Sequence, residues 1–242
     1  MLQACVNGSR NRDECPWLPL SPAELAQEAR AAVAAGAEDV HLHPKLPDGT
    51  DTLDPDVVAE VVQRVRAAVP GVPVGVTTGA WAVPDPAERA RLVRAWTVLP
   101  DHASVNWHEK GADLVAEALL ERGIGIEAGI YSGTDAAARF LDSPYSQRVL
   151  RVLAEVVDPD PTTAPTTAAT LLDALSGARR PPILLHGENG GAWPVLRLAA
   201  TLGLHTRIGL EDVLHDADGT TATGNVPLVA SARALLAAGG GA

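Results

Sequence analysis

The sequence predicts a (β/α)8 TIM barrel that occupies residues 1–242 as a single domain. Short apolar segments alternate eight times with Ala-rich amphipathic segments, a pattern that is typical of parallel βαβ units. Eight such units fit a closed barrel, which takes about 250 residues, better than an open doubly wound sheet. No GxGxxG motif follows the first apolar segment, which also disfavours a dinucleotide-binding open sheet.

The expected strands are the short apolar segments that turn residues separate. They cover residues 2–7, 38–43, 73–77, 103–107, 124–129, 149–156, 182–186 and 205–210. The expected helices lie between them and after the last one, where apolar residues recur at helical spacing. They cover residues 22–35, 55–69, 86–97, 111–122, 134–141, 164–177, 190–203 and 225–238.

Several of these helices begin at recognisable capping sequences. The segment 21–24 (SPAE) combines an N-cap serine, a proline at the first helical position and a glutamate that closes a capping box. Asp54-Pro55 and Asp85-Pro86 repeat the cap followed by proline. The Pro- and Thr-rich stretch 158–167 is expected to be a loop before the sixth helix rather than a domain linker, because it is short and the strand–helix alternation continues after it.

The composition excludes some classes of partner. The chain holds 19 Lys and Arg against 30 Asp and Glu, a net charge of −11, which disfavours nucleic acid and acidic membrane surfaces as partners. It has no apolar run of about 18 residues that would span a membrane. The two cysteines, Cys5 and Cys15, imply no disulfide framework, so we expect a cytoplasmic protein.

Polar residues gather where the expected strands end. In a β/α barrel the active site lies at the carboxyl ends of the strands, so these residues are the candidates for function. Four of the seven histidines fall at or just past such an end. The candidates in chain order are Asn7 and Arg10, His41 and His43, Thr77, Asn106 with His108 and Glu109, Glu127, Glu155, His186 with Glu188, and Arg207 with Glu211 and Asp212.

The segment His41-Leu42-His43 has the period of a strand, so both imidazoles point to the same face. Two imidazoles in the barrel mouth can chelate one metal ion, whereas the alternative is a pair of core histidines that bond to the backbone. A catalytic metal site needs a third ligand and an open position. Glu211, at the end of the last strand and close to the first two strands once the barrel closes, is the best candidate.

The other candidates each have a structural alternative. Arg207, Glu211 and Asp212 could form only an ion-pair cluster at the barrel rim. Glu127 and Glu155 lie inside strands, where a carboxylate needs a partner; each suits a metal ligand, a group behind the ligands, or half of an ion pair. His108 and His186 are single histidines that could lie outside the site.

Four segments also resemble a known family. They are H-L-H-P (41–44), V-T-T-G (76–79), S-V-N (104–106) and R-I-G-L-E-D (207–212). They follow one another in the order and spacing found in the β-keto acid cleavage enzymes, and the similarity covers essentially the whole chain. Pairing HxH on the second strand with RxGxED on the eighth is more specific than either motif alone.

This resemblance implies a zinc-binding β/α barrel that exchanges a β-keto acid with acetyl-CoA, giving acetoacetate and a new CoA thioester. His41, His43 and Glu211 resemble the metal ligands, and Arg207 and Asp212 resemble the pair that generates the carbanion. Two imidazoles and a carboxylate also suit manganese, cobalt or iron. We expect the partners to be these small molecules and a second or further copies of the chain, as a dimer or tetramer.

Five residues are predicted to bind the substrate: Arg10, Thr77, Asn106, His108 and Glu127. Thr77 matches a Ser or Thr of the family that contacts the substrate, and Asn106 matches an Asn of its fourth strand. Arg10 stands, within a one-residue gap, where the family's lysine-fermentation member has an acidic residue that receives an ammonium group. We therefore expect a substrate that is not cationic at that end and that carries a second carboxylate or another anionic group. Trp107-His108-Glu109 also departs from the small and hydroxyl residues of the family.

Two other functions are compatible with the pattern. A metal-dependent hydrolase or aldolase barrel would use the same ligands without acetyl-CoA. However, amidohydrolases place HxH on the first strand and add histidines on strands five and six, where this chain offers only glutamates. A non-catalytic ligand-binding barrel would need neither the metal ligands nor the Arg207–Asp212 pair.

Overall fold

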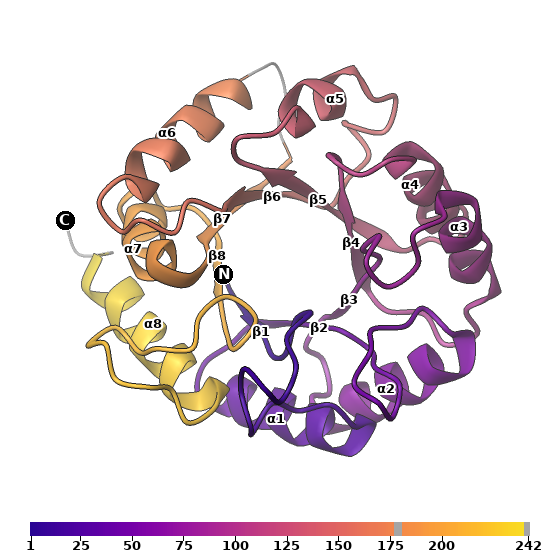
Figure 1. The fold of residues 1–242 in the computed structure, drawn as a ribbon, viewed down its shortest axis with the longest axis horizontal. Helices are drawn as coiled ribbons and strands as arrows, with labels where there is room; N and C mark the ends of the chain where they lie inside the picture. Colours follow the sequence, from indigo (N-terminus) through magenta and orange to yellow (C-terminus); the bar gives the residue numbers. More distant parts are fainter. Residues whose placement is uncertain (177–180, 240–242) are drawn as a thin grey trace.

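The computed structural model describes residues 1–176 and 181–239, and within these ranges eight parallel strands form a nearly closed barrel. The strand order is β7-β6-β5-β4-β3-β2-β1-β8. A single parallel bridge between Leu184 and His205 joins the two ends of the sheet. Figure 1 shows the ring of strands surrounded by helices. The predicted TIM barrel is therefore confirmed.

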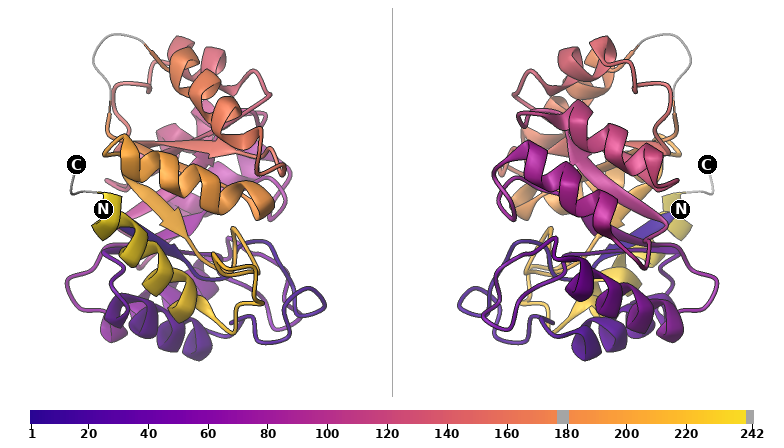
Figure 2. Two further views of the ribbon diagram at one scale, coloured as in Figure 1. Left: turned by 90° about the vertical axis from the view of Figure 1, so that its left-hand side faces the viewer. Right: turned by 90° about the vertical axis from the view of Figure 1, so that its right-hand side faces the viewer.

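The strands are β1 (Leu2–Cys5), β2 (Asp39–Leu42), β3 (Val74–Thr77), β4 (His102–Asn106), β5 (Gly125–Tyr131), β6 (Arg151–Val156), β7 (Ile183–Gly187) and β8 (Thr206–Ile208). The helices are α1 (Pro22–Ala34), α2 (Pro55–Ala68), α3 (Pro86–Ala95), α4 (Ala112–Glu121), α5 (Ala136–Asp142), α6 (Ala164–Ala174), α7 (Ala192–Thr201) and α8 (Asn225–Gly239), with a short 3-10 turn (Asn189–Gly191) before α7. Figure 2 shows the helices lying along the outside of the barrel.

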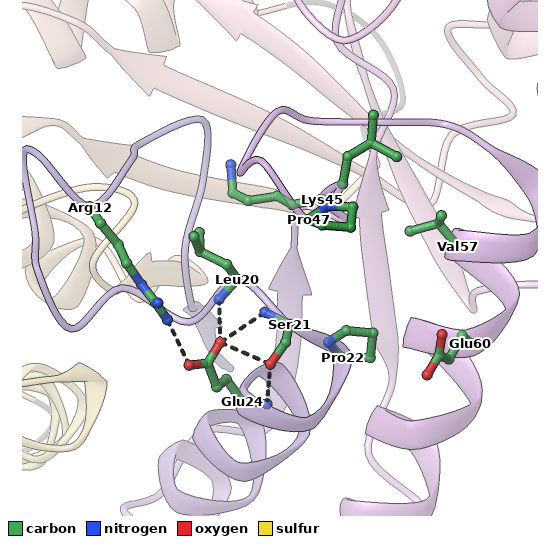
Figure 3. Close-up of a pocket in the computed structure, with 10 residues that line it drawn as sticks. Arg12, Leu20, Ser21, Pro22, Glu24, Lys45, Pro47, Val57 and Glu60 are labelled. Carbon is green, nitrogen blue, oxygen red and sulfur yellow. Dashed lines mark hydrogen bonds and ion pairs between the residues drawn. The ribbon is translucent and has the colours of Figure 1, made fainter.

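The three helix starts predicted from capping sequences, at residues 22, 55 and 86, are confirmed. The Ser21 side chain accepts from the backbone of Glu24, and the Glu24 carboxylate accepts from the backbone of Ser21, which completes the capping box of α1 (Figure 3). The Asp54 side chain accepts from the backbone of Asp56 and Val57 at the start of α2, and the Asp85 side chain accepts from the backbone of Ala87 at the start of α3. Each of these caps is followed by a proline. Each cap satisfies backbone N–H groups that have no partner inside the helix.

Some predicted boundaries differ from the structure. The last strand was expected over 205–210 but β8 ends at Ile208, because Gly209 begins a turn in which the backbone N–H of Asp212 bonds back to its carbonyl. The stretch before α6 is a loop, as predicted, and α6 ends at Ala174. Residue 177, the expected end of that helix, lies outside the described residues. None of the helices in the described ranges is long and apolar enough to cross a membrane.

The strands face two different environments. The side chains that point outward, such as Val40, Val76 and Ile126, are buried against the helices and form the apolar core. The side chains that point into the barrel alternate with them and are largely polar or charged, for example Gln3, Asp39 and His41. The barrel interior is therefore a buried polar column that leads from the amino-terminal ends of the strands to their carboxyl-terminal ends.

Candidate active site

Three side chains meet at the carboxyl ends of β2 and β8. His41 lies on β2, His43 follows it directly, and Glu211 lies on the turn after β8. One ligand atom from each lies within 4.8 Å of the others. The Nε2 atoms of His41 and His43 are 4.0 Å and 3.7 Å from Oε2 of Glu211. The sequence predicted that these three side chains lie close together, and in the structure they do.

The position of Glu211 follows from the closure of the barrel. β1 pairs with both β2 and β8, so the turn after β8 lies beside the end of β2. The backbone N–H of Glu211 donates to the carbonyl of Cys5 at 3.2 Å. Gly8 has a φ of +61°, and a Cβ there would overlap the side chain of Glu211. A glycine at position 8 therefore leaves the room that this carboxylate occupies.

These residues fit a divalent metal. Among the described residues, the buried Oε2 of Glu211 has no hydrogen-bond partner, although it faces both imidazoles. Two ligand atoms on one tetrahedral zinc ion lie about 3.3–3.5 Å apart, given zinc bonds of about 2.0–2.2 Å. The distances of 3.7 and 4.0 Å from Oε2 to the two Nε2 atoms are only slightly longer. The donor set of two imidazoles and one carboxylate leaves coordination positions open for a substrate.

Neighbouring charges set the protonation of Glu211 and His43. Burial raises the pKa of Glu211, but Arg207, His43 and His41 together hold it well below its usual value, so the group is a carboxylate. Burial lowers the pKa of His43, but Glu211 and Asp51 raise it to about 9. Because the carboxylates that favour a proton on His43 also attract other cations, the same charges favour a divalent ion.

Arg207, on β8, holds the two carboxylates that follow it. Its Nη2 atom donates to Oε1 of Glu211 and to Oδ1 of Asp212, each at 2.9 Å. Its Nε donates to Nδ1 of His186 at 3.2 Å. The second oxygen of Asp212, Oδ2, is buried and has no hydrogen-bond partner within the described ranges. Arg207 therefore holds one oxygen of Asp212 and leaves the other unpaired.

Three of the predicted substrate-binding residues lie near the carboxyl ends of the strands. The Thr77 hydroxyl, at the end of β3, accepts from the backbone N–H of Gly79. Asn106, at the end of β4, donates from its amide to Glu109 at 3.0 Å. The His108 ring packs against Tyr131, with ring centroids 4.3 Å apart.

Arg10 lies at the rim of the site on the loop after β1. Its guanidinium donates to Glu14 at 3.1 Å, to the side chain of Asn189 at 3.0 Å and to the carbonyl of Glu211 at 3.2 Å. The Arg10 side chain is mostly buried, whereas that of Glu14 is 44% exposed. The cationic group that the sequence predicted therefore lies at the rim of the site, but its guanidinium already forms an ion pair with Glu14.

Glu127 lies deeper than a substrate contact. Its carboxylate is completely buried, and Oε1 accepts from Gln3 at 2.8 Å and from Arg151 at 2.6 Å. Its Oε2 is 3.6 Å from Nδ1 of His41, on the side of the ring that faces away from Glu211. Its two oxygens are thus directed at protein groups, and the structure favours the alternative of a group behind the metal ligands over the substrate contact that we expected.

Cavities of similar size open near this end of the barrel. One of about 320 Å³ contains two of the metal-ligand candidates, His43 and Glu211, and is also lined by Ser9, Arg10, Glu14, Trp81, Tyr131, Glu188 and Asn189. Another, of about 430 Å³, lies at the start of α1 and α2 (Figure 3). There Arg12 is paired with Glu24, and Lys45 with Asp51. The first cavity is therefore the candidate active-site pocket.

Sequence reasoning missed two residues of this site, Asp51 and Tyr131. Asp51 is on the loop between β2 and α2, where no strand period marks it, yet it bonds to His43 at 2.8 Å. Tyr131 ends β5, which extends two residues beyond the expected strand. The alternation Glu127, Gly129, Tyr131 was the available signal that Tyr131 faces inward.

The chain belongs to the beta-keto acid cleavage enzyme family, whose model matches residues 1–241. This confirms the family that the four sequence segments predicted. The fold agrees: the apo structure of ObcA has a TM-score of 0.72 and 20% identity to this chain, and it covers 93% of this chain. The present chain spans 63% of that ObcA chain.

Two enzymes from other organisms are also similar in sequence to this chain. The 3-keto-5-aminohexanoate cleavage enzyme of Fusobacterium nucleatum is 24% identical over 253 residues, which cover 95% of this chain and 88% of the relative. The 3-oxoadipate:acetyl-CoA acetyltransferase of Cupriavidus necator is 36% identical over a shorter segment of 81 residues, which covers 33% of this chain and 28% of the relative.

The carboxyl of Glu188, which lines the pocket, predicts a pH dependence of stability. Burial and the neighbouring Glu155 raise its pKa from 4.5 to about 7. The folded state therefore holds this proton more tightly than the unfolded chain does, which contributes stability at low pH that is lost as the pH rises through 7. We expect Glu188→Gln to raise the melting temperature relative to wild type at pH 8 and to change it less at pH 5.

The measurement is thermal unfolding of the metal-free proteins with chelator present. Glu60→Gln is the matched control, because Glu60 is an exposed carboxylate that pairs with Arg64 on the surface of α2. An equal change at both pH values for Glu188→Gln would contradict the prediction.

Proposed function

We propose that this protein is a metal-dependent β-keto acid cleavage enzyme that uses acetyl-CoA. The reaction converts the β-keto acid and acetyl-CoA into acetoacetate and a new acyl-CoA thioester. The observation that carries the proposal is the meeting of His41, His43 and Glu211 with the Arg207–Asp212 pair at the carboxyl end of one barrel. Membership of the beta-keto acid cleavage enzyme family supports it.

His41, His43 and Glu211 would hold the metal, and we propose zinc as the native ion. A divalent metal bound there would supply a Lewis acid that polarises the carbonyl of the keto acid. The chain's own contribution is to orient the two imidazoles and the carboxylate. The buried, unpartnered Oε2 of Glu211, which faces both rings, supports this role.

Asp212 is the proposed base. Its free Oδ2 would take a proton from the carbon between the keto and carboxylate groups, while Arg207 keeps Oδ1 in place. The resulting carbanion attacks the thioester carbonyl, a carbon–carbon bond forms, and the CoA thiolate leaves. That thiolate then attacks the original keto carbon, the older carbon–carbon bond breaks, and Asp212 returns its proton to acetoacetate. A positioned base typically contributes about 100- to 10,000-fold to the rate of such a step.

Arg10 is the proposed contact for the far end of the substrate. It lines the pocket beside Glu211 and Tyr131. A second carboxylate on the substrate would pair with its guanidinium in place of Glu14, whose exposed side chain is free to turn toward solvent. Thr77, Asn106 and His108 are proposed to contact the reacting part of the substrate, although Asn106 already bonds to Glu109. A homo-oligomeric state and a cytoplasmic location stay predictions.

The reaction can be tested by the effect of Asp212→Asn on acetoacetate release. The isosteric amide keeps a partner for Arg207 but removes the base, so we expect kcat to fall about 100-fold or more. The assay measures acetoacetate from a panel of β-keto acids, with and without acetyl-CoA. Asp218→Asn, a change of an exposed carboxylate in the loop after Asp212 that bonds to Thr220, is the matched control.

Turnover that does not require acetyl-CoA would point to a hydrolase or aldolase on the same barrel. Unchanged turnover in Asp212→Asn, with acetyl-CoA required, would remove Asp212 from the mechanism while leaving the reaction in place.

Substrate charge gives a separate prediction. We expect β-keto acids with a second carboxylate to have a higher kcat/KM than amino-β-keto acids of similar length. Glu14→Gln should raise kcat/KM for the dicarboxylates further, because the amide no longer competes for Arg10. Steady-state kinetics on matched substrate pairs provides the measurement, and a strong preference for the amino compounds would show that Arg10 does not set the specificity.

A further inference from the structure

One carboxylate connects the candidate metal site to the pocket wall. Asp51 lies on the loop between β2 and α2, which folds back on itself through an antiparallel bridge between Lys45 and Asp51. The Asp51 side chain is 4% exposed. It accepts from three side chains, namely His43, Lys45 and Trp81.

The bond to His43 sets the state of that imidazole. Because a carboxylate can only accept, Nδ1 of His43 carries the hydrogen in the 2.8 Å contact with Oδ2 of Asp51. The lone pair of a neutral ring then lies on Nε2, which faces Oε2 of Glu211 at 3.7 Å. Carboxylates in this position fix the orientation and tautomer of metal-binding histidines. Glu127 lies in the corresponding position behind His41 but at 3.6 Å.

The same oxygen of Asp51 also holds Trp81. The indole Nε1 donates to Oδ2 at 2.7 Å. The indole ring is stacked on His43, with centroids 5.8 Å apart and planes 12° apart. Trp81 is 46% exposed and lines the candidate active-site pocket. Two contacts, one with Asp51 and one with His43, therefore hold a large exposed side chain beside the metal ligands.

Lys45 balances the charge of Asp51. Its ammonium group is buried and pairs with Oδ1, the oxygen that His43 and Trp81 leave free. Lys45 follows directly from the β2 end that carries His43, so one short hairpin supplies both the cation and the carboxylate. This arrangement lets a buried Asp51 stay ionised beside the imidazole, because a buried charge needs a partner.

We propose that Asp51 is a positioning residue that orients His43 for the metal and fixes Trp81 as a wall of the substrate pocket. The inference rests on the proposed metal site. Because one oxygen serves both side chains, binding of a metal at His43 changes the environment of the Trp81 indole. Asp51 acts through His43 and Trp81 and touches neither the metal nor the reacting atoms.

The test is metal affinity, measured on the apo-protein by zinc competition with a chelating dye. We expect Asp51→Asn to bind zinc about 10- to 100-fold more weakly than wild type. Asp48→Asn is the matched control, because Asp48 lies on the same hairpin and bonds to Thr50. Trp81→Phe, which keeps the Asp51–His43 bond, is expected to retain near-wild-type affinity.

Tryptophan emission supplies a second readout. The contribution of Trp81 is obtained by subtracting the spectrum of Trp81→Phe. We expect zinc to change this contribution in wild type and in Asp48→Asn but not in Asp51→Asn. Should the loss of Asp51 alone leave Lys45 buried without a partner and prevent folding, the double variant Lys45→Met/Asp51→Asn removes both charges together.

The outcomes separate the two proposals. Wild-type affinity in a folded Asp51→Asn or in the double variant overturns the role of Asp51, while the metal site itself stands. If wild type binds no zinc, the proposed metal function fails first.

Discussion

The pairing of β1 with both β2 and β8 is the constraint on which the candidate site depends. It places the turn after β8 beside the end of β2, so that residues 170 positions apart in the chain, His41 and Glu211, face one another. The backbone bond from Glu211 to Cys5 fixes this turn to β1. Without the pairing of β1 with both neighbours, His41 and His43 would lack the carboxylate of Glu211.

Beneath the metal ligands the barrel holds a buried set of charges, made up of Asp39, His102, Glu127 and Arg151. Each is paired, because an unpaired charge there would cost several kcal/mol. Burial lowers the pKa of His102, but Glu127 and Asp39 raise it to about 10. A glycine at position 75 leaves room for this ring. Glu127, a member of this set, lies behind His41, and Asp51 bonds to His43 in a similar way.

The sequence was sufficient to predict the barrel, its helix caps and the three ligand candidates, because strand period and cap chemistry are local signals. It did not predict Asp51 or the depth of Glu127. Asp51 reaches His43 through a hairpin whose geometry no period reveals, and inward-facing residues of one strand lie at different depths that depend on strand register. The sequence also did not predict the ion pair between Arg10 and Glu14. Residues four apart meet only where the chain turns, and nothing in the sequence of that loop indicated such a turn.

The most direct test of the central claim is the metal content of the purified protein beside that of His41→Ala, with His215→Ala as the control because His215 is exposed and outside the ligand group. The account predicts about one divalent ion per chain in wild type and in the control, and loss of that ion in His41→Ala, because two remaining ligands bind far more weakly than three. Equal metal content in all three proteins, or none in wild type, would contradict it.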